Sequence, residues 1–299
     1  MSRRGLMLFV AMCVIWGLPY LLIRISVSAI SPVFLVFART ALGAILLLPI
    51  AMARAEITVV VRRWRWLLAY SAVEIALPWV LLSDAETRIT SSLSGLLVAA
   101  VPLVGVIMVA ASGRGGGLGR LQVVGLVVGL VGVLAVLGLD LASLSVLAAL
   151  EMAVVVVCYS LGPQILARRL SGLPALGVVA CSLGICAVGY LPFAVLTVPR
   201  AVPDREVLLA IVILGVVCTA GAFIFFFELI AEVGAIRATV VTYVNPAVAV
   251  VLGVAILHER FTAGIGAGFA LILTGAVLAG RSRRPHPPPS LPRAAVMDG

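Results

Sequence analysis

The stretch VNPAVAVVLGVAILHERFTAGIGAGFALILTGAVLAG, residues 244–280, consists of two apolar runs separated by a short turn that carries its charge. A helix crosses a hydrocarbon core about 30 Å thick with about 20 apolar residues. Each run comes close to this length, and the connection between the runs is short. The stretch therefore predicts two neighbouring membrane helices that run in opposite directions.

Apolar runs of this kind fill the chain almost from end to end. We expect ten spans, at residues 6–23, 33–53, 66–82, 93–111, 121–139, 146–167, 175–197, 207–229, 238–257 and 263–280. Of the 299 residues, 63% are hydrophobic and 11% are charged, which leaves too little polar surface for a soluble globule. The expected fold class is an all-α polytopic membrane protein with ten transmembrane helices.

The ten spans fall into two sets of five that resemble each other at a constant spacing along the chain. Four pairs share this spacing: Trp16 and Tyr159, Pro49 and Pro192, Gly125 and Gly268, and Gly132 and Gly275. Chance recurrence among apolar segments of low complexity is the alternative. Because five is odd, the second set enters the membrane inverted, as in secondary transporters. We expect two inverted five-helix repeats, at residues 1–140 and 141–284, and a proline-rich, disordered cytoplasmic tail at 285–299.

The arginines indicate the orientation of the spans. All 21 basic residues are arginine; with the amino terminus inside, fifteen fall in cytoplasmic segments, five in outer segments and Arg39 within a span. The positive-inside rule therefore places both termini of this multi-pass protein in the cytoplasm. The absence of lysine beside abundant Ala, Val, Gly and Leu favours a GC-rich bacterium, and hence the bacterial inner membrane. Since the net charge of +9 is spread over short loops, it predicts no nucleic-acid binding.

Neither a metal site nor a cofactor is predicted. The five cysteines lie within apolar runs and form no CxxC pair, and both histidines lie outside the spans. Thiols that pack as small hydrophobic groups explain the cysteines. With no histidine in any span and no pair of deep acidic residues, the chain lacks the groups that an intramembrane protease needs.

Two ionisable residues fall well inside predicted spans, where a charge costs about 2.5–3.5 kcal/mol. At 1.5 Å per residue, Arg39 lies ~10 Å below the outer surface and Glu74 lies ~12 Å above the inner surface. Their similar depth on neighbouring helices permits a salt bridge. We expect Glu74 to carry a proton or to bind a cationic substrate, with Arg39 as its gate. The alternatives are a static ion pair and an Arg39 side chain that extends outward along its own helix.

Aromatic side chains can line a central substrate cavity, where they supply apolar contact and cation–π attraction. The candidates are Trp16, Tyr20, Trp79, Tyr159 and Tyr243. Asn245 adds an uncharged amide beside Pro246, which kinks its helix. An interfacial aromatic belt is the alternative, and it is the better explanation of Trp64 and Trp66. The predicted substrate site thus comprises these five aromatic residues, Asn245, Arg39 and Glu74.

Three segments resemble a known family, the EamA-type ten-helix transporters of the drug/metabolite transporter superfamily. WGLPYLLIR at 16–24 is similar to the family's Trp-Gly start of the first helix, and Arg39 in LVFARTALGAILLLP resembles its arginine in the second helix. Residues 244–280 resemble its proline in helix nine, its Glu-Arg turn and its glycine-rich last helix. The corresponding turn of the first repeat, ASGRGGGLGR at 111–120, has no glutamate, which argues against a symmetric pair of acidic turns.

The resemblance implies a secondary transporter that moves a small metabolite, an amino acid-like solute or a drug by alternating access. Many members of the family are exporters, so we expect export. The partners implied are a small-molecule solute, the lipid bilayer and protons as a candidate coupling ion. A non-transporting scaffold or receptor, or an intramembrane enzyme, is the alternative function. The solute, the direction, the coupling ion and the formation of a homo-oligomer stay open at this point.

Overall fold

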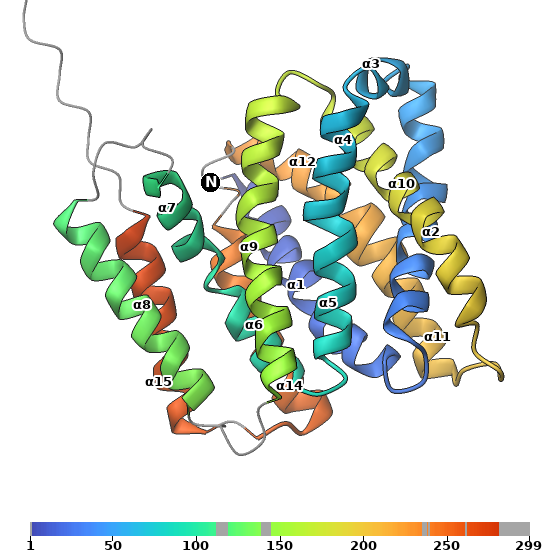
Figure 1. The fold of residues 1–299 in the computed structure, drawn as a ribbon. Helices are drawn as coiled ribbons and strands as arrows, with labels where there is room; N and C mark the ends of the chain where they lie inside the picture. Colours follow the sequence, from blue (N-terminus) through green and yellow to red (C-terminus); the bar gives the residue numbers. More distant parts are fainter. Residues whose placement is uncertain are drawn as a thin grey trace, which may run out of the picture.

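The computed structural model describes residues 2–111, 119–138, 145–234, 238, 240–260 and 262–280. Within these ranges the chain is helical and contains no β-strand (Figure 1). The predicted tail at 285–299 lies outside the described residues. The all-α expectation is therefore confirmed for the part of the chain that the structure describes.

The first half of the chain contains eight α-helices and one π-helical segment, η1, among the described residues. They are α1 (Arg3–Ser26), α2 (Pro32–Ala53), α3 (Ile57–Val61), α4 (Trp64–Tyr70), η1 (Ser71–Ala76), α5 (Leu77–Ala85), α6 (Ser91–Val98), α7 (Val101–Ala111) and α8 (Arg120–Gly138). α4, η1 and α5 form one continuous stretch. α6 and α7 are separated by a break at residues 99–100, just before Pro102, whose missing N–H is tolerated in a first helical turn.

The described part of the second half follows the same order. Its elements are α9 (Val146–Arg169), α10 (Ala175–Leu196), α11 (Arg205–Val212), the π-helical η2 (Ile213–Gly221), α12 (Ala222–Val233), α14 (Val241–Leu257) and α15 (Ala263–Ala279). Across both halves, seven helical stretches are long and apolar enough to cross a membrane, by length and composition. Three shorter apolar helices, Arg120–Val136, Val241–Leu257 and Ala263–Ala279, coincide with the remaining predicted spans.

Local sequence explains where several helices begin. Ser31 caps α2 by accepting a hydrogen bond from the Phe34 N–H at 3.2 Å, and Pro32 supplies the first helical residue. Thr262 caps α15 in the same way through the Ile265 N–H, also at 3.2 Å. These caps satisfy backbone donors at the ends of otherwise apolar helices.

The repeat seen in the sequence is also a repeat of structure. The spacing that separates Trp16 from Tyr159 also separates both ends of α1 from those of α9, both ends of α2 from those of α10, and the start of α8 from that of α15. The two π-helical segments, η1 and η2, also occupy equivalent positions in the two halves. Chance recurrence of apolar residues does not produce matching helix boundaries, so we set that alternative aside.

The close contact between α8 and α15 depends on glycine. A Cβ atom added at Gly125 would lie 2.7 Å from the Gly275 carbonyl oxygen, and one added at Gly132 would lie 2.8 Å from that of Gly268. Early residues of α8 thus face late residues of α15, so the helices are antiparallel (Figure 1). Since Gly125 corresponds to Gly268 and Gly132 to Gly275, exchange of the two repeats maps the contact onto itself. The glycines permit this approach of two backbones, as small residues do in membrane helices.

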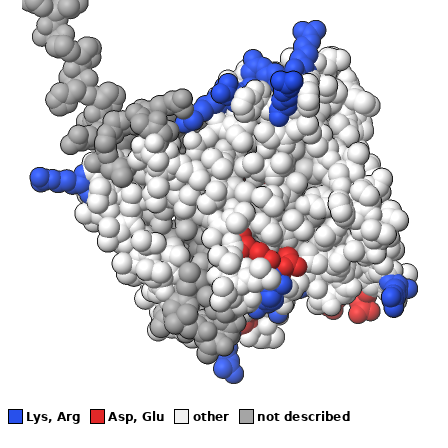
Figure 2. Space-filling model, in the orientation of Figure 1, with Lys and Arg blue, Asp and Glu red and all other residues white. Residues whose placement is uncertain are grey.

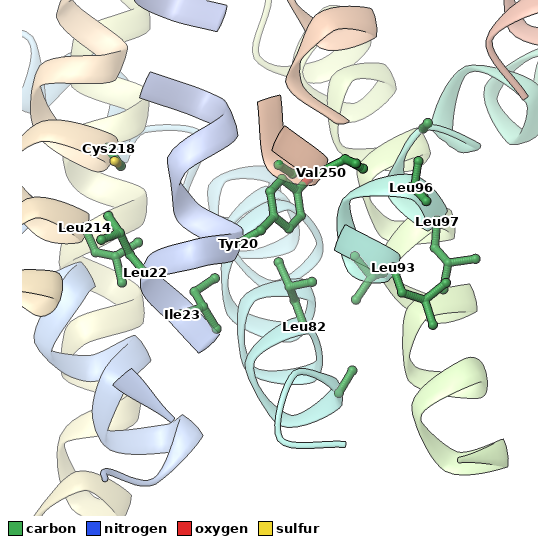
Figure 3. Packing of buried hydrophobic residues seen from close by; sticks show 14 of the residues in the cluster. Tyr20, Leu22, Ile23, Leu82, Leu93, Leu96, Leu97, Leu214, Cys218 and Val250 are labelled. Atoms are coloured by element: carbon green, nitrogen blue, oxygen red, sulfur yellow. The ribbon is translucent and has the colours of Figure 1, made fainter. Parts of the chain in front are cut away.

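Other pairs also join the two repeats: α2 packs against α10, α5 against α9, and α1 and α6 against α14. The main hydrophobic cluster contains residues of both halves, among them Tyr20, Leu82, Leu214 and Val250 (Figure 3). On the face shown in Figure 2, arginines gather at the upper edge, acidic residues and further arginines lie toward the lower edge, and a broad, largely uncharged band lies between them. Many large apolar side chains are exposed, as expected of a surface that faces lipid.

Candidate functional site

A buried arginine lies where the two repeats meet. Arg39 of α2 is only 7% exposed, and its Nε donates a hydrogen bond to the Thr219 hydroxyl in η2 at 2.8 Å. Its guanidinium carbon lies 3.6 Å from the ring centroid of Trp79 in α5. Stacking on tryptophan can stabilise a desolvated cation by ~2 kcal/mol, comparable to the cost of placing the charge in the membrane. Arg39 is therefore held by one residue from each repeat.

The salt bridge that similar depth permits between Arg39 and Glu74 is not formed. Within the described residues the ion pairs are Arg4–Glu228, Arg88–Asp84 and Arg88–Glu151, and no carboxylate pairs with Arg39. The Arg39 side chain crosses to η2 instead, so it does not extend outward along its own helix either. Arg39 contacts η2 and Glu74 contacts α9, so the two side chains point to different helices.

Glu74 lies in η1 and faces α9. One of its carboxylate oxygens is buried without a hydrogen-bond partner. A Cβ atom added at Gly162 would lie 2.8 Å from the Glu74 carboxyl carbon and still closer to Oε2, so only glycine leaves room for this side chain. The next residue, Pro163, has no N–H, which removes the helical donor for the Tyr159 carbonyl. The Glu74 carboxyl thus faces the helix in which the Tyr159 carbonyl has lost its helical hydrogen-bond donor.

Both π-helical segments contribute to this region. In η1 the Leu77 N–H bonds to the Ala72 carbonyl, five residues back, just before Pro78 interrupts the donor pattern. In η2 the Thr219 hydroxyl donates to the Leu214 carbonyl at 2.8 Å while it accepts from Arg39. π-Helical segments are rare in proteins, and those that occur are often found at functional sites. Sequence reasoning missed Thr219, although it is the sole hydroxyl residue of the apolar run at 207–229.

Two of the tyrosines predicted for the site lie near the same arginine. The side chains of Tyr20 and Tyr159, with the Cys218 thiol, lie near enough to the Arg39 guanidinium to interact electrostatically. Tyr159 packs against both of the larger hydrophobic clusters, and Figure 3 shows Tyr20 between Leu82 and Val250. Arg39, Trp79, Tyr159 and Tyr20 therefore form one cluster, which we call the Arg39 cluster. Glu74 borders it through its electrostatic interaction with Tyr159.

The other predicted residues are more dispersed. Trp16 packs against Phe226 of α12 with ring centroids 4.6 Å apart and the ring planes tilted by 46°. The backbone oxygen of Asn245 approaches Gly17 of α1, and its side-chain oxygen is buried without a partner. Tyr243 packs instead with a separate cluster that includes Ala100, Leu103, Val156, Ala276 and Ala279. The structure thus places Tyr243 away from the Arg39 cluster.

The cluster is present once, although the scaffold is repeated. Ser182 of α10 occupies the position of the second repeat that is equivalent to Arg39; it is fully buried, and its hydroxyl has no hydrogen-bond partner. The position equivalent to Glu74 is Val217, and that equivalent to Trp79 is Ala222. Both charged groups and the tryptophan therefore come from the first repeat, whereas Thr219 and Tyr159 come from the second.

The comparisons with known proteins agree with this repeated architecture. The model of the EamA-like transporter family matches residues 3–138 and again residues 146–281. The chain belongs to the EamA-like transporter family. A crystal structure of a protein also matches, with 22% identity and a TM-score of 0.63 over 94% of this chain and 97% of that one, which shows the shared fold. No curated protein matches the chain.

The acidic turn of this EamA-like chain caps a helix of the other repeat. The Glu259 carboxylate accepts hydrogen bonds from the backbone N–H groups of Ser91 and Ser92, at 2.8 and 3.0 Å, and from both hydroxyl groups. It therefore sits at the amino terminus of α6, where the helix dipole favours a negative charge. The resemblance of residues 244–280 to the family pointed to this glutamate, but its hydrogen-bond partners are visible only in the structure.

A second acidic group lies behind this cap. Glu86 follows α5, is fully buried, and neither of its carboxylate oxygens completes a hydrogen bond. Burial and the nearby Glu259 carboxylate raise the pKa of Glu86 well above its ordinary value, and Ser94 and Arg24 oppose this only in part. The Arg24 guanidinium donates to the Glu86 backbone carbonyl. Glu86 and Glu259 thus form an acidic pair at one end of the EamA-like bundle.

Metal binding finds no support in the described ranges, since no group of three or more His, Cys, Asp or Glu side chains is close enough there to hold an ion. The cysteines are free and buried. The chemistry that the Arg39 cluster offers is recognition: a fixed positive charge, aromatic surfaces and hydroxyl groups, enclosed by helices of both EamA repeats.

Proposed function

We propose that this protein is a secondary transporter that exports a small organic solute across the inner membrane of a bacterial cell. The observation that carries the proposal is the buried guanidinium of Arg39, to which no described carboxylate is paired. Such a charge is costly in a membrane protein and usually marks a substrate or ion pathway. Membership of a transporter family supports the same conclusion.

In the proposed topology, ten helices cross the bilayer and both termini lie in the cytoplasm. The antiparallel contact between α8 and α15, which repeat exchange maps onto itself, supports an inverted relation of the two halves. Rocking of one repeat against the other would open the Arg39 cluster to each side in turn, as in other inverted-repeat carriers. Breaks such as that between α6 and α7 supply places where such motion is absorbed.

The solute that fits the cluster best carries a carboxylate. Arg39 uses Nε for Thr219, and its terminal nitrogen atoms make no hydrogen bond to the described residues, so they can hold a carboxylate in a bidentate manner. Trp79 and the two tyrosines supply apolar contact for the rest of a small molecule. An amino acid-like solute or an organic acid meets these requirements.

Proton exchange is the coupling that the site supports. The Glu74 carboxyl is partly enclosed by α9 and has one oxygen without a partner. A carboxyl in such a place can bind a proton from one side and release it to the other as the bundle changes conformation. We propose that an entering proton on Glu74 accompanies the departure of the solute from Arg39.

The proposal is tested by solute flux in reconstituted vesicles. Proteoliposomes containing the wild-type protein are screened for counterflow of radiolabelled amino acids and organic acids, in parallel with Arg39→Gln and with Arg200→Gln as a control on an exposed loop residue. We expect a carboxylate-bearing solute to exchange with wild type and with Arg200→Gln only. Absence of exchange for every solute would support a scaffold or receptor, and chemical conversion of a solute would support an enzyme.

A further inference from the structure

Five arginines that are not part of the Arg39 cluster converge at one end of the molecule. A surface hollow of about 530 Å³ is lined by Arg62, Arg63 and Arg65 around the start of α4 and by Arg168 and Arg169 at the end of α9. Trp64 and Trp66 complete its wall. No acidic residue lines this hollow, so its positive charge has no counter-ion from its own lining. Figure 2 shows arginines gathered along this upper edge.

A second hollow adjoins the first and continues onto the side of the bundle. It has a volume of about 510 Å³, shares Trp66, Arg168 and Arg169 with the first, and extends along α9 over Leu161, Gln164 and Ile165. Leu161 is 36% exposed and Trp66 is 40% exposed, so this part offers apolar surface to its surroundings. The two hollows together combine a cationic end with an apolar groove.

Contacts between the two helices hold this arrangement in place. The Arg169 guanidinium carbon lies 4.3 Å from the Trp66 ring centroid, and Arg63 donates a hydrogen bond to the Arg169 carbonyl at 2.6 Å. This carbonyl belongs to the last residue of α9, where the helix presents unpaired carbonyl groups. The stacking and the hydrogen bond therefore fix one wall, and the five arginines that line the hollow are all exposed and able to bind an anion.

From this geometry we infer that the hollow binds the phosphate headgroup of an anionic phospholipid whose acyl chain lies in the groove along α9. Arginine forks match phosphate oxygens in a bidentate manner, and basic pockets beside membrane helices recognise such headgroups. Trp64 and Trp66 lie at the start of α4, and tryptophan is enriched at the ends of membrane helices, where the rings meet lipid headgroups. A phospholipid satisfies both hollows at once, whereas a free phosphate would use only the first. The proposal does not depend on which solute the protein carries.

Tryptophan quenching tests the proposal on the full-length protein. The protein is reconstituted into phosphatidylcholine vesicles with increasing fractions of phosphatidylglycerol whose acyl chains are brominated, since bromine quenches only nearby indole rings. Trp64 and Trp66 are the reporters, and the same titration with brominated phosphatidylcholine gives the baseline. We expect stronger quenching at low fractions of the anionic lipid, and loss of this preference in the Trp64→Phe/Trp66→Phe variant.

The arginines are then removed in matched pairs. For Arg168→Gln/Arg169→Gln we expect the preference for the anionic lipid to fall about 30-fold, or about 2 kcal/mol, since each arginine near an anionic headgroup is worth ~1 kcal/mol and tenfold is ~1.4 kcal/mol. Arg200→Gln/Arg205→Gln, which removes two arginines elsewhere, should leave the preference intact. If the first pair fails to fold, Arg62→Gln/Arg65→Gln takes its place, because both side chains are exposed.

Three results would overturn the inference. Equal quenching by the two brominated lipids would show no headgroup preference at all. A preference that survives the loss of Trp64 and Trp66, or of the arginine pairs, would place the lipid elsewhere. Full competition by soluble glycerol phosphate would show a site for a free anion and not for a phospholipid.

Discussion

Replacement of Gly275 by alanine should separate the two terminal helices of the repeats. The added Cβ atom would lie 2.6 Å from the Gly125 carbonyl oxygen and closer still to the Gly129 backbone, whereas ordinary contacts begin at 3.4 Å. Backbone atoms cannot rotate away, so α15 and α8 must move apart by a large fraction of 1 Å. Overpacking of this kind costs ~1–3 kcal/mol, and a protein of this size loses about 2–4 °C in Tm per kcal/mol. We therefore expect Gly275→Ala to unfold about 5 °C below wild type.

The assay is the temperature at which half of the detergent-purified protein loses its monodisperse peak in size-exclusion chromatography. Gly189→Ala is the matched control, because Gly189 is also helical but nothing lies within 4 Å of the added Cβ. Its Tm should stay equal or rise, since alanine favours helix over glycine by up to ~1 kcal/mol. Gly132→Ala should behave like Gly275→Ala, because repeat exchange relates the two sites. Equal Tm values for Gly275→Ala and Gly189→Ala would refute the argument.

Four further results follow from the two sites. Arg39→Gln should reduce solute flux at least about 100-fold, because two charge-assisted hydrogen bonds of ~1.5–3 kcal/mol each are lost, and Arg39→Lys should restore only part of it; equal flux in both variants would contradict this. Glu74→Gln should keep counterflow but abolish accumulation driven by a pH gradient, and accumulation that persists would exclude Glu74 as the proton carrier. Glu259→Gln should lower Tm by a few degrees, because the cap on α6 is worth ~1–2 kcal/mol; an unchanged Tm would count against that cap. Glu86→Gln should raise Tm at pH 8 and have little effect near pH 4.5. Because the pKa of this carboxyl is raised in the folded protein, its ionisation costs more there than in the unfolded chain, so the native state loses stability as pH rises above about 4.5. A Tm difference that is independent of pH would disprove this explanation.

The helices and the repeat followed from the sequence because hydrophobicity and length are local properties. The span predicted at 33–53 begins within one residue of α2, and Ser31 with Pro32 supplies the reason. The constant spacing that relates Gly125 to Gly268 also separates the two segments that the family model matches. A pattern that recurs over five helices carries more information than any single motif.

The candidate site was only partly predictable because a sequence gives depth but not rotation. Arg39 and Glu74 were recognised by their charge, but their sequence positions left open whether they pair; they do not, because each side chain points to a different helix. Thr219 carries no charge, and its role depends on a π-helical turn that hydropathy does not reveal. Trp79 was found, but its position over the guanidinium depends on how α5 packs against α2.

The two repeats carry different side chains at equivalent positions, and this difference has an energetic consequence. In a carrier made of inverted repeats, swapping the conformations of the halves converts the inward-open form into the outward-open form, so perfect symmetry would make both forms degenerate. In this protein, Ser182 occupies the position of the second repeat that is equivalent to Arg39, so only the first repeat carries a cation there. In the alternating-access mechanism proposed above, the two open forms would then differ in free energy, so the empty carrier would prefer one side before any ion gradient is applied.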